Sequence, residues 1–184
     1  MAEKFQNAPQ RKQISLLYEP SDFIVAVHVR TGDIDPTAES FFVTILAALL
    51  PYLEDIPYRI HVFAEGKGAD DYPAIASLTR PHRVIFHPDL PPFETFFHLT
   101  QSHIFIMAAS GFSQFAALLA TKPLVFSPPS RETFPLKFCP PYAVCCNQNG
   151  HFDMEGLLRF HRRKERWLAS RCYIKTRRRG AKVE

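Results

Sequence analysis

The sequence predicts an α/β fold, namely a Rossmann-like, doubly wound and mainly parallel sheet in a single lobe. Three observations support this fold class. Short apolar runs rich in β-branched and aromatic residues alternate with segments whose apolar residues recur every three or four positions. The 16 prolines gather mostly between these segments, and no apolar run reaches membrane-spanning length. Such alternation is typical of strands joined by crossover helices.

The first expected strand, Phe23–Val29, is the most informative segment of the chain. It is short, largely apolar and followed by Arg30 and a Gly-containing turn. His28 and Arg30 are two positions apart, so on an extended chain they project to the same face. Ligands of open α/β sheets bind at the carboxyl ends of strands, and an Arg fork holds two phosphate oxygens. The strand therefore predicts an anion site beside Arg30.

The remaining elements follow from the same patterns of hydrophobicity. Further strands are expected at 59–64, 83–87, 103–107, 123–127 and 142–146, where the apolar runs are short. Helices are expected at 38–53, 70–78, 93–101, 112–120 and 153–170, where the apolar spacing is helical. Residues 1–22 read as an irregular lead-in, 23–158 as the Rossmann-like domain and 159–184 as a basic C-terminal helix or tail.

Charge is distributed unevenly along the chain. Residues 159–184 hold eleven Lys or Arg and two Asp or Glu, whereas residues 1–158 are mildly acidic. A basic segment can contact nucleic acid or acidic lipid, but aromatic residues for base stacking are sparse here. We favour a solvated tail and do not expect nucleic acid as a partner.

The cysteines and the N-terminus bear on whether the protein binds a metal, is secreted or spans a membrane. The four cysteines (Cys139, Cys145, Cys146 and Cys172) lack the spacing of a metal site, so we expect no metal. Cys145 and Cys146 are expected to pack as small hydrophobic residues. The polar N-terminus has no signal-peptide core, which predicts a cytoplasmic protein without a membrane span.

A second candidate ligand segment lies at the expected junction of the strand 103–107 with the helix 112–120. Small residues occupy 108–111, and they allow a ligand to approach the backbone closely. A helix N-terminus offers unpaired N–H groups, and Ser110 and Ser113 add hydroxyls. Two other interpretations remain open: Ser110 acts as a helix N-cap, and Arg30 pairs with Asp33. Neither the GxGxxG nor the GxxxxGK[ST] pattern occurs.

Two motifs in order resemble a known family. His28–Asp33, with the sequence HVRTGD, is similar to the HxRxGD motif of the α1,2-, α1,6- and protein O-fucosyltransferase superfamily. Residues 110–117 look like the later SxFSxxAA motif of that superfamily, and 60–65 resemble its middle strand. The resemblance covers about residues 23–127. Thr31 stands where many fucosyltransferases carry a second basic residue, so the resemblance indicates a nucleotide-sugar transferase and leaves the sugar open.

The resemblance implies the donor-binding lobe of a GT-B-type glycosyltransferase. Arg30 would stabilise the diphosphate leaving group of a GDP- or UDP-sugar without a metal or other cofactor, and residues 23–158 would bind the donor. A glycan or a protein would accept the sugar, with Asp33 and Asp35 preferred over Glu39, Glu65 and Asp89 as its base. The donor-binding residues implied are His28, Arg30, Gly32, Glu65, Ser110, Gly111, Phe112 and Ser113. A non-catalytic or truncated nucleotide-sugar-binding lobe is the alternative, and a nucleic-acid partner of residues 159–179 is a third.

Overall fold

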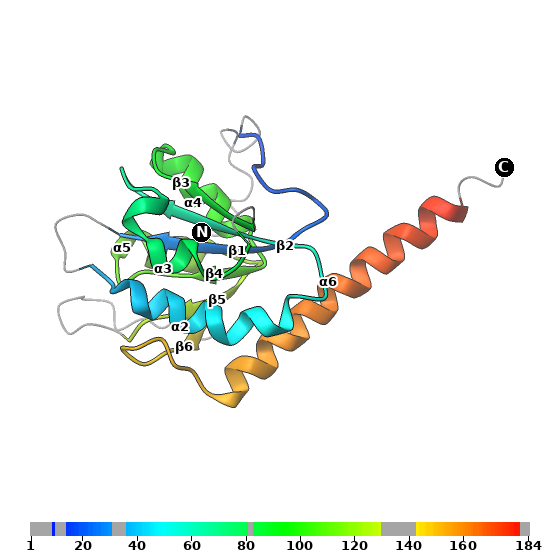
Figure 1. Cartoon of the computed structure of the whole chain (residues 1–184). Helices are drawn as coiled ribbons and strands as arrows, with labels where there is room; N and C mark the ends of the chain where they lie inside the picture. The colour runs from blue at the N-terminus through cyan, green and yellow to red at the C-terminus, as the bar shows by residue number, and fades with distance from the viewer. Residues whose placement is uncertain (1–8, 10–13, 31–35, 81–82, 130–142, 181–184) are drawn as a thin grey trace.

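The computed structural model describes residue 9 and residues 14–30, 36–80, 83–129 and 143–180, with side chains up to residue 171. Within these residues the chain forms a six-stranded parallel sheet in the order β3-β2-β1-β4-β5-β6 (Figure 1). The strands are β1 (Phe23–Val29), β2 (Tyr58–Ala64), β3 (Val84–His87), β4 (Ile104–Ile106), β5 (Leu124–Ser127) and β6 (Val144–Cys145). The predicted doubly wound fold class is confirmed.

Strand β1 lies between β2 and β4, where the direction of winding reverses. All seven of its residues are buried, because helices cover both faces of the sheet. Its pairing with β2 runs without interruption from Phe23↔Tyr58 to Val29↔Ala64. The bounds of β1 agree with the sequence prediction residue for residue.

The two faces of the sheet bury two separate apolar clusters. Phe23, Val25 and Val27 point to one face, which is covered by α2, α3 and α6. Ile24 and Ala26 point to the other face, which is covered by α4 and α5. The helices are α2 (Glu39–Leu49), α3 (Pro73–Ala76), α4 (Pro92–Gln101), α5 (Gly111–Leu119) and α6 (Met154–Gly180), with the short 3-10 turns η2 (Leu50–Tyr52) and η3 (Ala69–Asp71).

Prolines account for the way two expected helices divide. Pro73 splits the expected helix 70–78 into η3 and α3, because proline lacks an N–H group and is tolerated in the first turn of a helix. Pro51 lies in η2, which ends the helical segment begun by α2. The sequence prediction therefore located both helical segments, but it treated α2 and η2 as one helix and η3 and α3 as another.

Helix α6 is longer than predicted and leaves the body of the protein (Figure 1). It continues to Gly180 instead of ending near residue 170, and the expected boundary at 158/159 lies inside it. Phe160 and Trp167 are both buried on the sheet, with ring centroids 6.3 and 5.5 Å from that of Phe23. These two aromatic residues attach the helix to the core. Among the described helices, none combines the length and the apolar character needed to cross a membrane.

The two adjacent cysteines differ in state. Cys146 is a buried free thiol whose pKa is raised to about 12, mainly because burial disfavours the thiolate. It packs as the sequence predicted. Cys145 is exposed and disulfide-bonded, so the expectation that it packs as a small hydrophobic residue was wrong. Successive residues of an extended chain face opposite sides, which explains why Cys146, directly after β6, enters the core and Cys145 does not.

We expect Gly150→Ala to destabilise the protein strongly. Gly150 has φ +86°, and a Cβ there would collide with the backbone carbonyl of Phe41 in α2. The combined conformational and steric cost is about 2–5 kcal/mol. Urea denaturation measures this loss. Gly66→Ala is the matched control: its φ is +64° but nothing lies within 4 Å, so we expect only about 1–2 kcal/mol. Equal losses in the two variants would contradict the steric argument.

Candidate functional site

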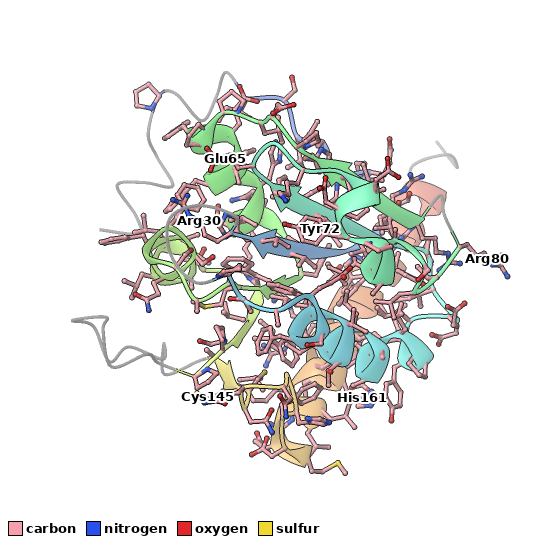
Figure 2. All side chains as sticks on the ribbon, turned by 60° about the vertical axis from the view of Figure 1, so that its left-hand side comes forward. Arg30, Glu65, Tyr72, Arg80, Cys145 and His161 are labelled. Atoms are coloured by element: carbon pink, nitrogen blue, oxygen red, sulfur yellow. The ribbon has the colours of Figure 1, made fainter. Side chains whose placement is uncertain are left out.

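A cavity of about 350 Å³ opens at the carboxyl ends of β1, β2 and β3. Arg30 and Glu65 lie at this edge of the sheet and Arg80 lies at the opposite edge (Figure 2). The first turn of α4 and Phe112 of α5 complete the walls. The cavity is lined by His28, Arg30, Phe63, Ala64, Glu65, His87, Pro88, Asp89, Leu90, Pro91, Pro92, Thr95 and Phe112.

The strand register brings Arg30 and Glu65 together. Val29 pairs with Ala64 at the end of the β1–β2 ladder, so the residues that follow them, Arg30 and Glu65, lie side by side. Arg30 Nη1 lies 3.6 Å from Glu65 Oε2, and the Arg30 side chain is 33% exposed. An ion pair this exposed contributes little stability. The guanidinium therefore lies at the cavity wall in a weak, solvent-exposed pair with Glu65. Glu65 is one partner of Arg30, and Asp33, the partner considered from the sequence, lies outside the described residues.

His28 connects β1 to α5. Its Nδ1 lies 2.6 Å from Ser113 Oγ, and its ring centroid is 5.1 Å from that of Phe112. Burial first, and the positive charge of Arg30 second, lower the His28 pKa to about 4. The imidazole is therefore neutral at pH 7. It contributes one hydrogen-bonding group to the cavity, and the charge comes from Arg30.

The serines predicted to bind phosphate are directed into the protein. Ser110 is the N-cap of α5, and its Oγ accepts a hydrogen bond from Ser113 N at 3.2 Å. The Ser113 hydroxyl is buried against His28. Ser110, Gly111 and Ser113 do not line the cavity, so the N-cap interpretation describes Ser110 better than direct phosphate contact. Phe112 does line it, whereas the Ser113 N–H of the same turn is used by the Ser110 cap.

The cavity thus gathers four of the sequence-predicted residues, namely His28, Arg30, Glu65 and Phe112. Gly32, Asp33 and Asp35 lie outside the described residues. Asp89, a secondary candidate for the base, also lines the cavity. Among the described residues, no group of three His, Cys, Asp or Glu is arranged to hold a metal ion.

Sequence reasoning missed a histidine cluster beside the cavity. His87 ends β3 and lines the cavity, and its Nε2 lies 2.9 Å from Nδ1 of the buried His61 on β2. Their rings are stacked with centroids 5.1 Å apart. His98 of α4 is fully buried on the same face, and the Tyr18 hydroxyl donates to its carbonyl at 2.9 Å. The signal that could have predicted this cluster is the presence of His61 and His87 inside otherwise apolar strand segments.

These histidines are kept neutral. Burial is the first cause that lowers the pKa of His61, to about 3, and of His98, to about 4. The nearby His87 adds to both shifts, and its own pKa is lowered by burial. Neither ring nitrogen of His98 has a hydrogen-bond partner in the described structure. His28 and His87, the two histidines that line the cavity, are therefore neutral at pH 7. The other ionisable residues in its lining are Arg30, Glu65 and Asp89.

Comparisons with known proteins give a similarity of fold. No protein-family model matches the sequence, and no curated protein does. Among solved structures, the chain is similar to E. coli ADP-heptose LPS heptosyltransferase II, with a TM-score of 0.49 and 11% identity. The match covers 92% of this chain and 52% of that one, so this chain spans about half the length of the heptosyltransferase.

We expect the protein to lose stability as the pH falls from about 6.5 towards 4. The ordinary pKa of 6.5 applies to these histidines in the unfolded chain, whereas in the fold those of His28 and His98 are about 4. The unfolded state therefore binds more protons in this window, and acid favours it. Each such histidine lowers the unfolding free energy by up to about 1.4 kcal/mol per pH unit. Urea denaturation at several pH values measures the slope.

The variant His98→Leu tests the source of this slope. It removes one buried imidazole whose ring nitrogens have no described partner. The slope of the unfolding free energy against pH should therefore decrease by the contribution of about one histidine. His151→Leu is the control, because His151 is exposed and its removal should leave the slope unchanged. A wild-type slope in His98→Leu would show that another group causes the acid sensitivity.

Proposed function

We propose that the protein binds a nucleotide sugar in the cavity at the carboxyl ends of β1–β3, and that it acts as a glycosyltransferase of the GT-B type. The observation that carries the proposal is the position of Arg30. It directly follows strand β1 and lines the same cavity as His28 and Phe112, which contact each other. The volume of about 350 Å³ is in the range of small-molecule sites.

Arg30 suits the diphosphate of the donor. A guanidinium presents two parallel N–H groups to phosphate oxygens and stays charged at every physiological pH. Its partly exposed pair with Glu65 orients it in the absence of ligand. The N–H groups of Gly111 and Phe112, at the start of α5, are the further donors that we propose for the anion. In this proposal these groups hold the diphosphate without a metal ion.

The reaction we propose is an inverting transfer. An acceptor hydroxyl attacks the anomeric carbon of the sugar and loses its proton to a carboxylate, while the bond from that carbon to the diphosphate oxygen breaks. Negative charge grows on the diphosphate as the bond breaks, and a cation already in position stabilises it. Arg30 is the described residue suited to this role. Asp33, Asp35, Glu65 and Asp89 are the candidate bases.

The walls favour a ligand with an organic part as well as a charge. Phe63 and Phe112 give apolar surface, and the neutral His28 and His87 give single hydrogen bonds. Glu65 and Asp89 can accept hydrogen bonds from sugar or ribose hydroxyls. The HxRxGD resemblance at His28–Asp33 supports a relation to fucosyltransferase-like enzymes, with the donor sugar left open by Thr31.

We expect Arg30→Ala to weaken binding of GDP, UDP and their sugars at least about tenfold, because a charged hydrogen-bonding partner of the diphosphate is lost. Isothermal titration calorimetry of the wild type and the variant measures this. Arg80→Ala is the matched control: it removes the same charge from an exposed position at the opposite edge of the sheet (Figure 2).

The outcomes separate the possible functions. If no nucleotide or nucleotide sugar binds the wild type at millimolar concentration, the proposal fails. If Arg30→Ala binds as well as the wild type, the diphosphate role of Arg30 fails. Binding without transfer or donor hydrolysis in an acceptor screen would indicate the alternative, a non-catalytic nucleotide-sugar-binding lobe.

A further inference from the structure

A second concave site lies away from the Arg30 cavity, beside the amino ends of β1 and β4. It has a volume of about 180 Å³ and is lined by His103, Arg163, Arg166, Trp167 and Ser170. The four α6 residues are spaced three, four and seven positions from Arg163, so they share one face of the helix. His103 directly precedes β4. The site is therefore formed where one face of α6 crosses the edge of the sheet.

Arg163 carries a donor that lacks a partner. Its Nε is buried without a hydrogen bond in the described structure, and no described carboxylate forms an ion pair with Arg163 or Arg166. A buried charged donor without a partner is costly. Burial first, and the charge of Arg166 second, lower the pKa of Arg163. Two guanidinium groups that have no described carboxylate partner, on one concave surface, favour an anion between them.

His103 adds a third donor with a fixed direction. The Ile24 N–H donates to His103 Nδ1 at 2.9 Å, and the ring stacks on Phe23 with centroids 4.9 Å apart. Burial, Arg163 and Lys122, in that order, lower the His103 pKa to about 4. The neutral ring therefore carries its proton on Nε2, because Nδ1 accepts the backbone hydrogen bond. The ring contributes an N–H donor to the same cavity as the two arginines.

We propose that this cavity binds the phosphate group of a small soluble ligand, held by Arg163 and Arg166 with the His103 Nε2–H as a further donor. Bidentate guanidinium groups and an imidazole N–H match the oxygens of a phosphate or phosphomonoester. The small volume between helix and sheet suits one such group. Trp167 is 8% exposed and has the Arg171 guanidinium 4.7 Å from its ring centroid, so it is not placed to stack on a nucleic-acid base.

Trp167 provides a direct measurement, since it lines the cavity and is the sole tryptophan of the chain. We expect inorganic phosphate and glycerol 3-phosphate to change its fluorescence in a saturable manner at constant ionic strength. Sodium chloride at the same ionic strength should not. The double variant Arg163→Gln/Arg166→Gln should raise the half-saturating concentration at least about tenfold. Arg162→Gln removes the same charge from the same helix, at a 66% exposed side chain, and should leave the response unchanged.

A second measurement guards against misfolding of the double variant. Phosphate should shift the ring proton signals of His103 in the NMR spectrum of the wild-type protein, and circular dichroism reports whether each variant is folded. Arg30→Ala should leave the Trp167 response intact, so failure of the nucleotide proposal would not affect this one.

Three results would overturn the phosphate site. One is an equal response to chloride, and another is an unchanged response in the folded double variant. The third is a response to RNA or to vesicles of phosphatidylglycerol without any response to the two small phosphates.

Discussion

The register of β1 against β2 is the constraint on which both the core and the candidate site depend. Seven consecutive pairs, from Phe23↔Tyr58 to Val29↔Ala64, hold the two central strands together. A slip of one residue would exchange the faces of every side chain in β1. The apolar residues at 23, 25 and 27 would then leave α2, and His28 would lose Ser113. The pattern that buries the core also delivers Arg30 and Glu65 to one edge.

The face covered by α4 and α5 is less apolar than its burial suggests. His28, His61 and His98 lie there among Phe63, Phe105 and the small residues of α5. Their neutral state avoids the cost of a buried charge, but His98 still lacks partners for its ring nitrogens. The His61–His87 contact links this face to the cavity wall. A histidine that lines the cavity is thus held by one that is buried behind it.

Much of the fold could be predicted because hydrophobic periodicity is local information. The bounds of β1 agreed fully, and the other described strands were found within two residues at either end. The length of α6 was not predicted, because beyond Arg162 its sequence is polar, and Phe160 and Trp167 attach it through contacts distant in sequence. At the site, the sequence identified both Arg30 and Glu65 but not the ion pair between them. The sequence around the start of α5 does not define which way the Ser110 and Ser113 side chains point. Their inward orientation follows from the packing of α5 on β1, which only the structure shows.

The carboxyl and amino ends of the sheet each carry an arginine side chain, and the two are positioned for different physical reasons. At the carboxyl end, parallel strands open towards solvent, and Arg30 is fixed by its position after β1 and balanced by Glu65. At the amino end, α6 crosses the sheet because Phe160 and Trp167 pack on Phe23. That packing places Arg163 over His103 without a carboxylate partner in the described structure. A helix attached for hydrophobic reasons therefore carries an unbalanced positive charge into a partly buried place. A charge in such surroundings is screened less than one on an open surface, so the amino end of the sheet attracts anions independently of Arg30.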